Sequence, residues 1–403
     1  MKKKLLSVLL CGAMLTGMTA CGADASQKKE TQTEAVAEAV TETSTETAKA
    51  DSGSENGGEE TVDIVDQNDM TATVKKNPDR VVMTALPLPS IYALTGEPIE
   101  NLVGVHPGST SAIENSVMAS MYPELLGIPD NFIEGTDINV EELLKLDPDV
   151  VMYWAEYLEQ YDVMNSAGIP AVGVKTQGNG DVLTTLESWL EIMGEMYDDD
   201  NGNVEKVIDY GRQVESEIKE VTDTIPEDKK PKVLYLYNHS SEDISVSGAD
   251  FYGDYWIKAG GGINAAGELS GPSSVNMEQI YEWNPDIIII TTFTETMPDD
   301  LYNNTIDGQD WSQVNAVING KVYKEPLGVY RWFPPSGDAP LMLKWMAQTL
   351  NPDYFSYDMN EEIKSYYKEF YQYDLTDDQV EGILTANPEA AKGASFGGAA
   401  ANK

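Results

Sequence analysis

The sequence predicts an α/β fold made of two Rossmann-like lobes with parallel sheets, joined by one long inter-lobe helix. Three observations lead to this prediction. Short apolar segments such as Val150–Trp154 and Ile287–Thr292 alternate with helical stretches, which is typical of buried parallel strands and the helices that cover them. A segment of the first half recurs in the second half. Between the two copies lies Asn203–Thr224, a long amphipathic stretch.

The inter-lobe stretch Asn203–Thr224 has the apolar spacing of a single helix face. Apolar or small residues recur at steps of three and four: Val204, Val207, Ile208, Gly211, Val214, Ile218 and Val221. Asn203 is expected to cap the N-terminus of this helix, and Pro226 is expected to end it. A helix of about 22 residues spans about 33 Å, which is long enough to connect two lobes.

The repeat relates residues 139–151 to residues 276–288. Four pairs of identical residues fall at the same offsets: Asn139/Asn276, Glu141/Glu278, Pro148/Pro285 and Asp149/Asp286. Each copy predicts a short helix, a Pro-Asp turn and a buried strand. A generic connection could match by chance, but the shared pattern of apolar positions favours a duplicated lobe.

The N-terminal 60 residues are expected to lie outside the folded body. Lys2, Lys3 and Lys4 precede an apolar run that is too short to span a membrane, so residues 1–20 are interpreted as a secretory signal. Residues 21–60 are mostly Thr, Glu, Ala, Ser and Gly, and such a segment cannot bury enough apolar surface to fold. We therefore expect a disordered tether over 21–60, and a disordered Ala- and Gly-rich tail over 390–403.

The body is divided into an N-terminal lobe (61–200), the inter-lobe helix (201–226) and a C-terminal lobe with extra helices (227–389). An opening hairpin is expected over 62–74. Further strands are expected at 80–85, 102–106, 150–154, 171–174, 233–237, 287–292 and 322–325. Helices are expected at 90–95, 113–122, 140–146, 158–167, 252–259, 277–283, 341–350, 359–370 and 376–384.

Charge and cysteine content exclude several classes of function. The chain has 26 Lys and Arg residues against 68 Asp and Glu residues, a net charge of −42. This argues against nucleic acid as a partner and against binding to anionic lipid by charge. Cys11 leaves with the signal, so only Cys21 would remain and disulfides are excluded. The H-E-x-x-H, P-loop and C-x-x-C motifs of common enzyme classes are absent from the sequence.

Met18-Thr19-Ala20-Cys21 resembles a bacterial lipobox, which implies cleavage before Cys21 and attachment of lipid to it. The body resembles the ABC-importer substrate-binding lipoproteins of the iron-siderophore, haem and cobalamin class (periplasmic binding proteins of class III). The resemblance rests on the lipobox, on residues 62–82, on the two repeat segments, on Gly260–Asn264 and on Asn319–Tyr323. It implies a cell-membrane protein that is lipid-anchored on the extracytoplasmic face. It further implies a monomer without a cofactor that captures an iron chelate and delivers it to an ABC permease.

In that family, one glutamate on each lobe docks an arginine of the permease, and Glu141 and Glu278 match these positions. The alternative is a helix N-terminal glutamate favoured by the helix dipole. Ligand-binding residues are expected at the strand ends, where a cleft between α/β lobes lies. The candidates are Tyr92, His106, Tyr153, Trp154, His239, Tyr252, Trp256, Phe293, Tyr330, Arg331 and Trp332.

Aromatic residues at strand ends suit a large, flat or conjugated ligand, although core packing is the alternative for any one of them. Arg331 would meet an anionic group or stack on a ring. His106 and His239 could ligate the metal of a chelate, or be structural. Two histidines are too few for a typical zinc or manganese capture site, so no metal site is predicted. A surface-anchored hydrolase or other cleft enzyme is the alternative function.

Overall fold

The folded body opens with a hairpin that precedes both lobes. The computed structural model describes residues 60–198, 202–386 and 388–391. The predicted signal peptide, the lipid attachment at Cys21, the tether and residues 392–403 of the tail lie outside the described residues. Strands β1 (Thr61–Val65) and β2 (Thr71–Lys75) pair antiparallel, which confirms the expected hairpin.

The first lobe contains a wholly parallel sheet of four strands in the order β4-β3-β7-β8. The strands are β3 (Val81–Met83), β4 (Leu102–Val105), β7 (Val150–Trp154) and β8 (Ala171–Val174). The helices are α1 (Leu88–Tyr92), α2 (Pro107–Glu114), α3 (Met118–Met121), α4 (Val140–Lys145), α5 (Leu158–Ser166) and α6 (Val182–Met196). The turns η1 (Ile99–Asn101) and η2 (Pro123–Leu125) and the small hairpin β5 (Ile133–Glu134) and β6 (Asp137–Ile138) complete the lobe.

Two helices of the first lobe differ from the prediction. The single helix expected over 113–122 is instead α2 and α3, because the chain turns at Asn115 and Ser116 and the Ser116 hydroxyl accepts a hydrogen bond from the Met118 amide. Helix α6 was not predicted. Asp181 caps this helix by accepting from the Thr184 amide at 2.9 Å, and nine of its side chains, including Trp189, are buried.

The second lobe has a mixed sheet, so the prediction of two parallel sheets is wrong for part of it. The path is β12-β10-β9-β13-β14, and β11 also pairs with β9. The strands are β9 (Lys232–His239), β10 (Ile244–Ser247), β11 (Ile263–Asn264), β12 (Pro272–Val275), β13 (Ile287–Ile290) and β14 (Val322–Lys324). Strands β9 and β10 are joined by a short turn, in which the Ser240 amide donates to the Asp243 carbonyl, and such a turn can only connect antiparallel strands.

The second lobe and the C-terminal segment supply the remaining helices. These are η3 (Glu227–Lys229), α8 (Tyr252–Ala259), α9 (Met277–Trp283), α10 (Pro298–Tyr302), α11 (Asn315–Ile318), α12 (Ala339–Leu350), α13 (Met359–Phe370), α14 (Asp377–Leu384) and η4 (Pro388–Ala391). Among the helices of the described segments, none is both long and apolar enough to cross a membrane.

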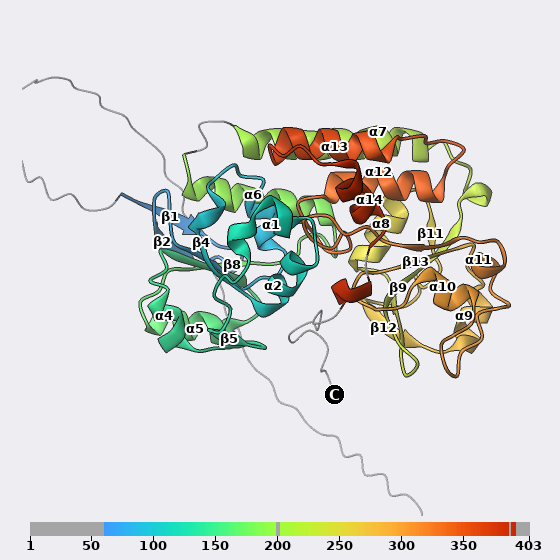
Figure 1. Cartoon of the computed structure of the whole chain (residues 1–403), viewed down its shortest axis with the longest axis horizontal. Helices are drawn as coiled ribbons and strands as arrows, with labels where there is room; N and C mark the ends of the chain where they lie inside the picture. Colours follow the sequence, from blue (N-terminus) through green and yellow to red (C-terminus); the bar gives the residue numbers. More distant parts are fainter. Residues whose placement is uncertain (1–59, 199–201, 387, 392–403) are drawn as a thin grey trace, which may run out of the picture. The chain divides into compact units, whose positions relative to one another are not determined.

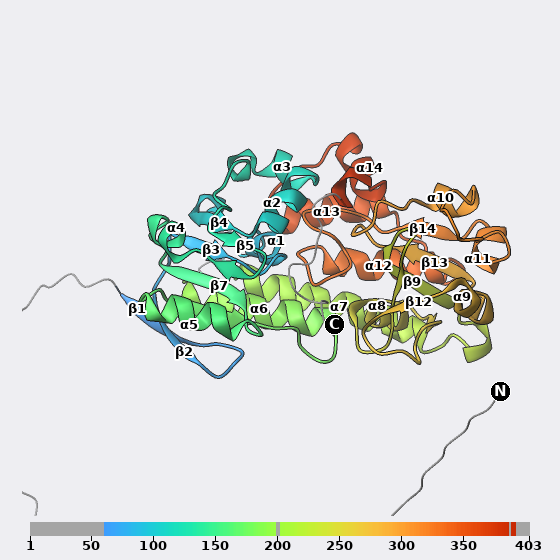
Figure 2. The ribbon, with the colours of Figure 1, turned by 90° about the horizontal axis from the view of Figure 1, so that it is seen from below.

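Helix α7 (Asn203–Thr222) is the predicted inter-lobe helix. It packs on α6 of the first lobe and on α8 and α12 of the second, and it runs along both lobes (Figures 1 and 2). Its buried residues are Val207, Gly211, Val214, Ile218 and Thr222. Asn203 is the first helical residue rather than the cap, since the left-handed Gly202 precedes the helix. The two-lobed α/β fold class is confirmed.

The repeated segment has the same structure in both lobes. Asn139 and Asn276 cap α4 and α9 by accepting from the backbone amide three residues on. The residues before the two prolines, Asp147 and Asn284, have left-handed φ values of 46° and 44°. These matched features support the interpretation of a duplicated lobe.

The repeat aspartates brace the first strand of each sheet. Asp149 Oδ2 accepts from the Arg80 amide at 3.1 Å, just before β3. Asp286 Oδ2 accepts from the Lys232 amide at 2.9 Å, at the start of β9. Each of these basic residues also donates its side chain to the carbonyl at the end of the repeat helix, Arg80 to Leu146 and Lys232 to Trp283. The repeat is therefore the element that orients each helix against its sheet.

Candidate functional site

Five aromatic side chains gather where the strands of the second lobe end, and we call them the aromatic cluster: Tyr237, Phe251, Tyr252, Phe293 and Phe333. Tyr237 contacts Phe251 at a centroid distance of 5.1 Å and Phe293 at 6.0 Å. Phe251 stacks on Tyr252 at 5.1 Å. Phe333, which has no exposed surface, contacts all the other four rings.

Four different elements bring these rings together. Tyr237 lies in β9, Phe251 and Tyr252 begin α8, Phe293 follows β13, and Phe333 lies in the segment between β14 and α12. The fold thus converts strand ends that are distant in sequence into one apolar surface. Tyr237, Phe251 and Tyr252 are partly exposed, so this surface is not only core.

The aromatic cluster faces the first lobe. The Tyr252 hydroxyl lies 2.7 Å from the Thr176 hydroxyl, in the segment that follows β8. Gly180, at a φ of 89°, approaches the Phe251 backbone so closely that a Cβ would lie 2.9 Å from its carbonyl carbon. Trp154, at the end of β7, is half-buried and meets Trp189 edge-on at 5.5 Å. The cluster therefore lies at the junction of the two lobes.

Arg331 places a positive charge beside the cluster. Its guanidinium carbon lies 4.9 Å from the centroid of the Phe293 ring, and Nη1 donates to the Thr292 carbonyl at 3.0 Å. The side chain is 1 % exposed, and burial lowers its pKa. Its neighbour Tyr330 is also buried, and burial raises the pKa of that hydroxyl to about 12. The pair is therefore a cation and a neutral phenol.

Two further buried charges hold the segment that carries Phe293. Glu325 accepts from the Thr292 amide at 2.9 Å and from the Tyr235 hydroxyl at 2.7 Å. The Lys324 ammonium donates to the Thr294 and Thr296 carbonyls at 2.6 and 2.8 Å, and burial lowers its pKa to about 8. Since three of these four partners belong to residues 292–296, the two side chains hold this segment in place.

Both histidines are occupied by hydrogen bonds within the protein. His106 Nδ1 accepts from the Gly108 amide at 2.9 Å, so Nε2 carries the proton and donates to the Gly135 carbonyl at 3.1 Å. His239 lies between the Thr296 hydroxyl and the Gln309 side-chain oxygen, at 3.0 and 2.7 Å. Burial lowers the pKa of each imidazole. This geometry corresponds to the structural alternative for both residues.

Four predicted ligand-binding residues lie in the core of the structure, which favours the core-packing alternative for them. Tyr92 bonds the Tyr197 hydroxyl at 3.0 Å inside the first lobe. Tyr153 points to the opposite face of the sheet and stacks on Tyr161. Trp256 and Trp332 have no exposed surface, and their indole nitrogens donate to the Phe333 carbonyl and to Asp338. Like Arg331 and Phe333, all four are buried in this structure.

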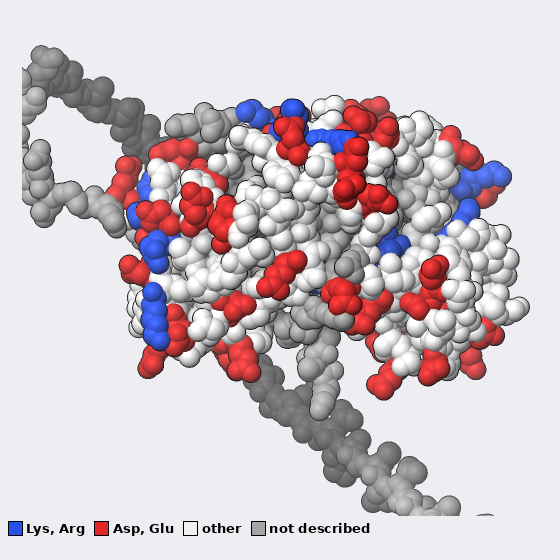
Figure 3. Space-filling model, in the orientation of Figure 1, with Lys and Arg blue, Asp and Glu red and all other residues white. Residues whose placement is uncertain are grey.

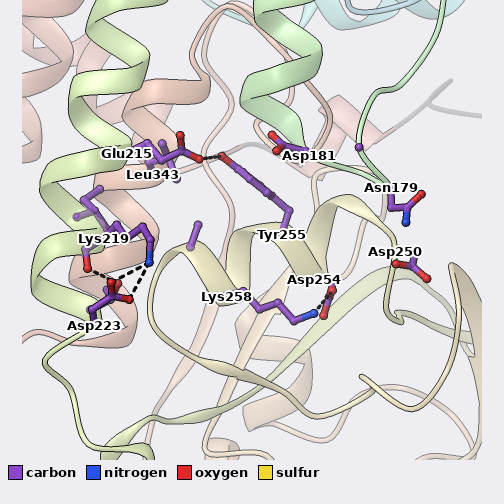
Figure 4. A pocket seen from close by; sticks show the side chains of 14 residues that line it. Asn179, Asp181, Glu215, Lys219, Asp223, Asp250, Asp254, Tyr255, Lys258 and Leu343 are labelled. Carbon is purple, nitrogen blue, oxygen red and sulfur yellow. Dashed lines mark hydrogen bonds and ion pairs between the residues drawn. The ribbon is translucent and has the colours of Figure 1, made fainter.

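Two hollows lie near these residues, one in the second lobe and one between the lobes. One, of 510 Å³, is lined by residues around Asn238, His239, Phe293 and Thr296, and by Ala391 of η4. The other, of 470 Å³, lies between α7, α8 and residues 178–181 (Figure 4). Three of its five carboxylates have partners nearby: Asp223 pairs with Lys219, Asp254 with Lys258, and Glu215 accepts from the Tyr255 hydroxyl. Only the first hollow borders the aromatic cluster.

In the described part of the chain, no group of three or more His, Cys, Asp or Glu residues could hold a metal ion.

The sequence model of the periplasmic binding proteins matches residues 95–326, more than half of the chain. The chain belongs to the periplasmic binding protein family. A periplasmic solute binding protein from Veillonella parvula has a solved structure with a TM-score of 0.73 and 34% sequence identity. That match covers 81% of this chain and 97% of the other.

Two curated relatives of this periplasmic binding protein are more distant. The molybdate-binding protein MolA of Haemophilus influenzae is 24% identical over 331 residues, covering 77% of this chain and 90% of MolA. The ABC transporter substrate-binding lipoprotein YvrC of Bacillus subtilis is 24% identical over 306 residues, covering 73% of this chain and 87% of YvrC. The protein is accordingly a solute-binding protein of an ABC transporter, with a small ligand and a permease as partners. The family consists of binding proteins and not of enzymes, so the alternative function of a surface-anchored hydrolase is not supported.

The two candidate docking residues have equivalent surroundings. Glu141 and Glu278 are each the second residue of a repeat helix, and both are exposed. Helices α4 and α9 lie near the lower edge of Figure 1, whereas α7 runs along its top. Acidic side chains are spread over the face seen in Figure 3, with few basic ones among them. This distribution agrees with the predicted exclusion of nucleic acid.

Sequence reasoning did not select several residues that form this site. Phe333 and Thr176 were not among the residues expected at the strand ends. The buried charges of Glu325 and Asp338 were also missed. Charged residues inside a largely apolar segment, as with Lys324, Glu325 and Arg331 in residues 322–333, are the signal that could have indicated Glu325.

Proposed function

We propose that this protein is a lipid-anchored, extracytoplasmic solute-binding protein that captures an iron chelate and delivers it to an ABC permease. The chelate would be a ferric siderophore, haem or a related macrocycle, held between the two lobes. The observation that supports this proposal is the aromatic cluster at the lobe junction, together with Trp154 on the opposite lobe. Rings of this kind offer large, flat apolar contacts at a low cost in side-chain entropy.

The polar groups of the site suit a metal that arrives already chelated. Both nitrogens of each histidine are engaged within the protein, so neither imidazole offers a lone pair to iron. Recognition would then act on the organic shell of the chelate, through ring contacts and through the positive charge of Arg331. Burial raises the pKa of the Tyr330 phenol to about 12, further above neutral pH than its ordinary value.

A bare oxyanion is the second candidate ligand. It is favoured by Arg331 and by the relative MolA, which is named as molybdate-binding. Other proteins of this fold include Helicobacter pylori CeuE with Ni(II) bound and the heme binding protein HmuT, so the fold alone does not select a ligand. The chelate is the better fit, because the aromatic cluster provides apolar area that a small oxyanion would leave unused.

The anchoring and docking proposals rest on sequence motifs. Residues 18–21 resemble a lipobox, and the relative YvrC is named as a lipoprotein. We propose that Cys21 carries the lipid, that the protein acts as a monomer, and that Glu141 and Glu278 meet basic residues of the two transmembrane subunits. Exposed charge pairs of this kind mainly set orientation and association rate.

A fluorescence titration tests the ligand class. The emission of the purified protein would be followed with haemin, cobalamin, ferric siderophores of the catecholate and hydroxamate types, and molybdate. Iron-free siderophores serve as matched controls. We expect saturable quenching at sub-micromolar concentration by one ferric chelate or macrocycle and no response to molybdate. A response to molybdate alone would refute the chelate proposal in favour of the oxyanion.

A further inference from the structure

The segment from Leu327 to Asp338, which we call the site loop, is a long loop without regular structure that is buried throughout. Every residue from Lys324 to Pro340 is buried. Connecting loops normally lie at the surface, because buried backbone polar groups need partners. Loops of this length inside a compact body are usually functional. The site loop carries Tyr330, Arg331 and Phe333 to the ligand site.

Asp338 is the acceptor on which the site loop converges. Its Oδ2 accepts from the Val329 amide at 3.0 Å and from Trp332 Nε1 at 3.0 Å, which are both groups of the loop itself. The Tyr367 hydroxyl donates to the same oxygen at 2.8 Å. The Tyr371 hydroxyl donates to Oδ1 at 3.2 Å. Asp338 has no exposed surface, and it stands at the N-terminus of α12 without capping that helix by its side chain.

Two glycines let the loop pass close to Asp338 and to the tyrosines that bond it. A Cβ on Gly328 would meet Asp338 Oδ2 at 1.7 Å and the Tyr367 hydroxyl at 2.6 Å. A Cβ on Gly337 would meet the Tyr371 hydroxyl at 2.1 Å. The Tyr366 hydroxyl also donates to the Gly337 carbonyl at 2.6 Å, so two tyrosines of α13 and Tyr371, which follows the helix, hold the end of the loop.

The site loop also reaches the first lobe. The Gly337 amide donates to the Ser90 hydroxyl of α1 at 3.3 Å. On the other side, the Leu327 amide donates to the Ile383 carbonyl of α14 at 3.0 Å. The loop is therefore fixed at both ends. The carboxylate of Asp338, its last residue, accepts the hydrogen bonds from Val329 and Trp332 in its middle.

We infer that Asp338 is a positioning residue for ligand binding, because it fixes the loop conformation that places Phe333 against the other four rings of the aromatic cluster and Arg331 over Phe293. This inference rests on the proposed function of the lobe junction as the ligand site. A carboxylate offers two acceptor oxygens to the four donors. An asparagine of the same shape offers one oxygen and directs an N–H₂ group at the remaining donors, so the loop would lose its single conformation.

The test compares Asp338→Asn with Asp358→Asn in the full chain. Asp358 is the exposed N-cap of α13, and asparagine caps helices as well as aspartate does, so this control makes the same chemical change away from the loop. The probes are haemin and a ferric catecholate. We expect Asp338→Asn to lower the affinity for whichever probe binds the wild type at least tenfold, and Asp358→Asn to change it less than twofold.

A local measurement separates positioning from general loss of stability. Hydrogen exchange at the Val329 amide reports whether the site loop opens, and we expect it to be at least tenfold faster in Asp338→Asn. Val172→Ala, a core truncation in β8, serves as a variant with lowered stability but an intact loop. Tyr367→Phe removes one donor and keeps the ring, so it gives a milder variant in case Asp338→Asn does not fold.

Three outcomes decide the inference. Weaker probe binding and faster Val329 exchange in Asp338→Asn or Tyr367→Phe, but not in Val172→Ala, support it. Unchanged Val329 exchange, or equal loss of affinity in Val172→Ala, overturns it. If neither probe binds the wild type while Val329 exchange still accelerates, the loop role stands and the proposed ligand class is the part that fails.

Discussion

Replacing Phe333 with alanine tests whether the aromatic cluster is both core and ligand surface. The Phe333 ring has no exposed surface and packs against Tyr235, Tyr237, Phe251, Tyr252 and Phe293 at centroid distances from 5.0 to 6.2 Å. Truncating a buried phenylalanine to alanine typically lowers the free energy of unfolding by about 3–5 kcal/mol. Because so many ring contacts are lost at once, we expect a loss near about 5 kcal/mol in the free energy of unfolding.

The same substitution should weaken ligand binding, because the neighbouring rings lose the surface that orders them. We expect the affinity for the ferric chelate to fall more than tenfold in a fluorescence titration, and the unfolding free energy to be measured by urea denaturation. Phe355→Ala is the matched control. Phe355 is also buried and stacks on Tyr357 at 5.9 Å, but it lies outside the aromatic cluster. An affinity within twofold of the wild type in Phe333→Ala would refute the role of the cluster in binding.

Three further predictions concern docking, pH and the lobe junction. Reversing both charges, Glu141→Arg with Glu278→Arg, should abolish uptake in cells while the ligand affinity measured by titration stays within twofold; normal uptake would contradict the docking assignment. Burial raises the pKa of Asp338 from its ordinary 3.8 to about 6, so the folded state binds this proton more tightly than the unfolded state does. The contribution of Asp338 to the free energy of unfolding should then fall as pH rises from about 4 to about 6, by at most about 3 kcal/mol. Urea denaturation at several pH values measures this fall, and Asp338→Asn should abolish it. The same pH dependence in the wild type and in Asp338→Asn would contradict the prediction. Gly180→Ala should lower the free energy of unfolding more than Gly168→Ala does, since both glycines have positive φ values but only a Cβ on Gly180 would clash with Phe251. Equal losses, near about 1 kcal/mol each, would show that the backbone at Phe251 moves away from the added Cβ at little cost.

The fold was largely predictable because its main signals are local. The stripe of α7, the Asn caps at residues 139 and 276, and the strand Ile287–Ile290 are each encoded within a few residues. One of the missed elements lacks such a signal. Strand β12, with sequence Pro-Ser-Ser-Val, becomes a strand because β10 supplies a partner for its backbone. Helix α6 does have an apolar face, and the sequence interpretation overlooked it.

The site was less predictable because side-chain direction depends on tertiary structure. Tyr153 and Trp154 are neighbours in β7, and successive residues of a strand point to opposite faces of a sheet. Only Trp154 turns toward the junction, while Tyr153 packs under α5 beside Tyr161. Likewise Asp338 accepts hydrogen bonds from the hydroxyls of Tyr367 and Tyr371, which lie 29 and 33 residues away in the sequence. Local sequence patterns do not reveal contacts at such separations.

The contacts of the C-terminal segment with the first lobe bear on the order in which the chain can fold. The Ser90 hydroxyl accepts from the Gly337 amide across 247 residues, and the Ser120 hydroxyl accepts from Gln379 across 259 residues. Closing loops of this length costs the most chain entropy, so such contacts form after local structure exists. The sheet of the first lobe needs only residues 81–174, which leave the ribosome early. The site loop, by contrast, makes its hydrogen bonds with α13 and α14, which are synthesised last. The proposed binding site can therefore form only after these helices are complete.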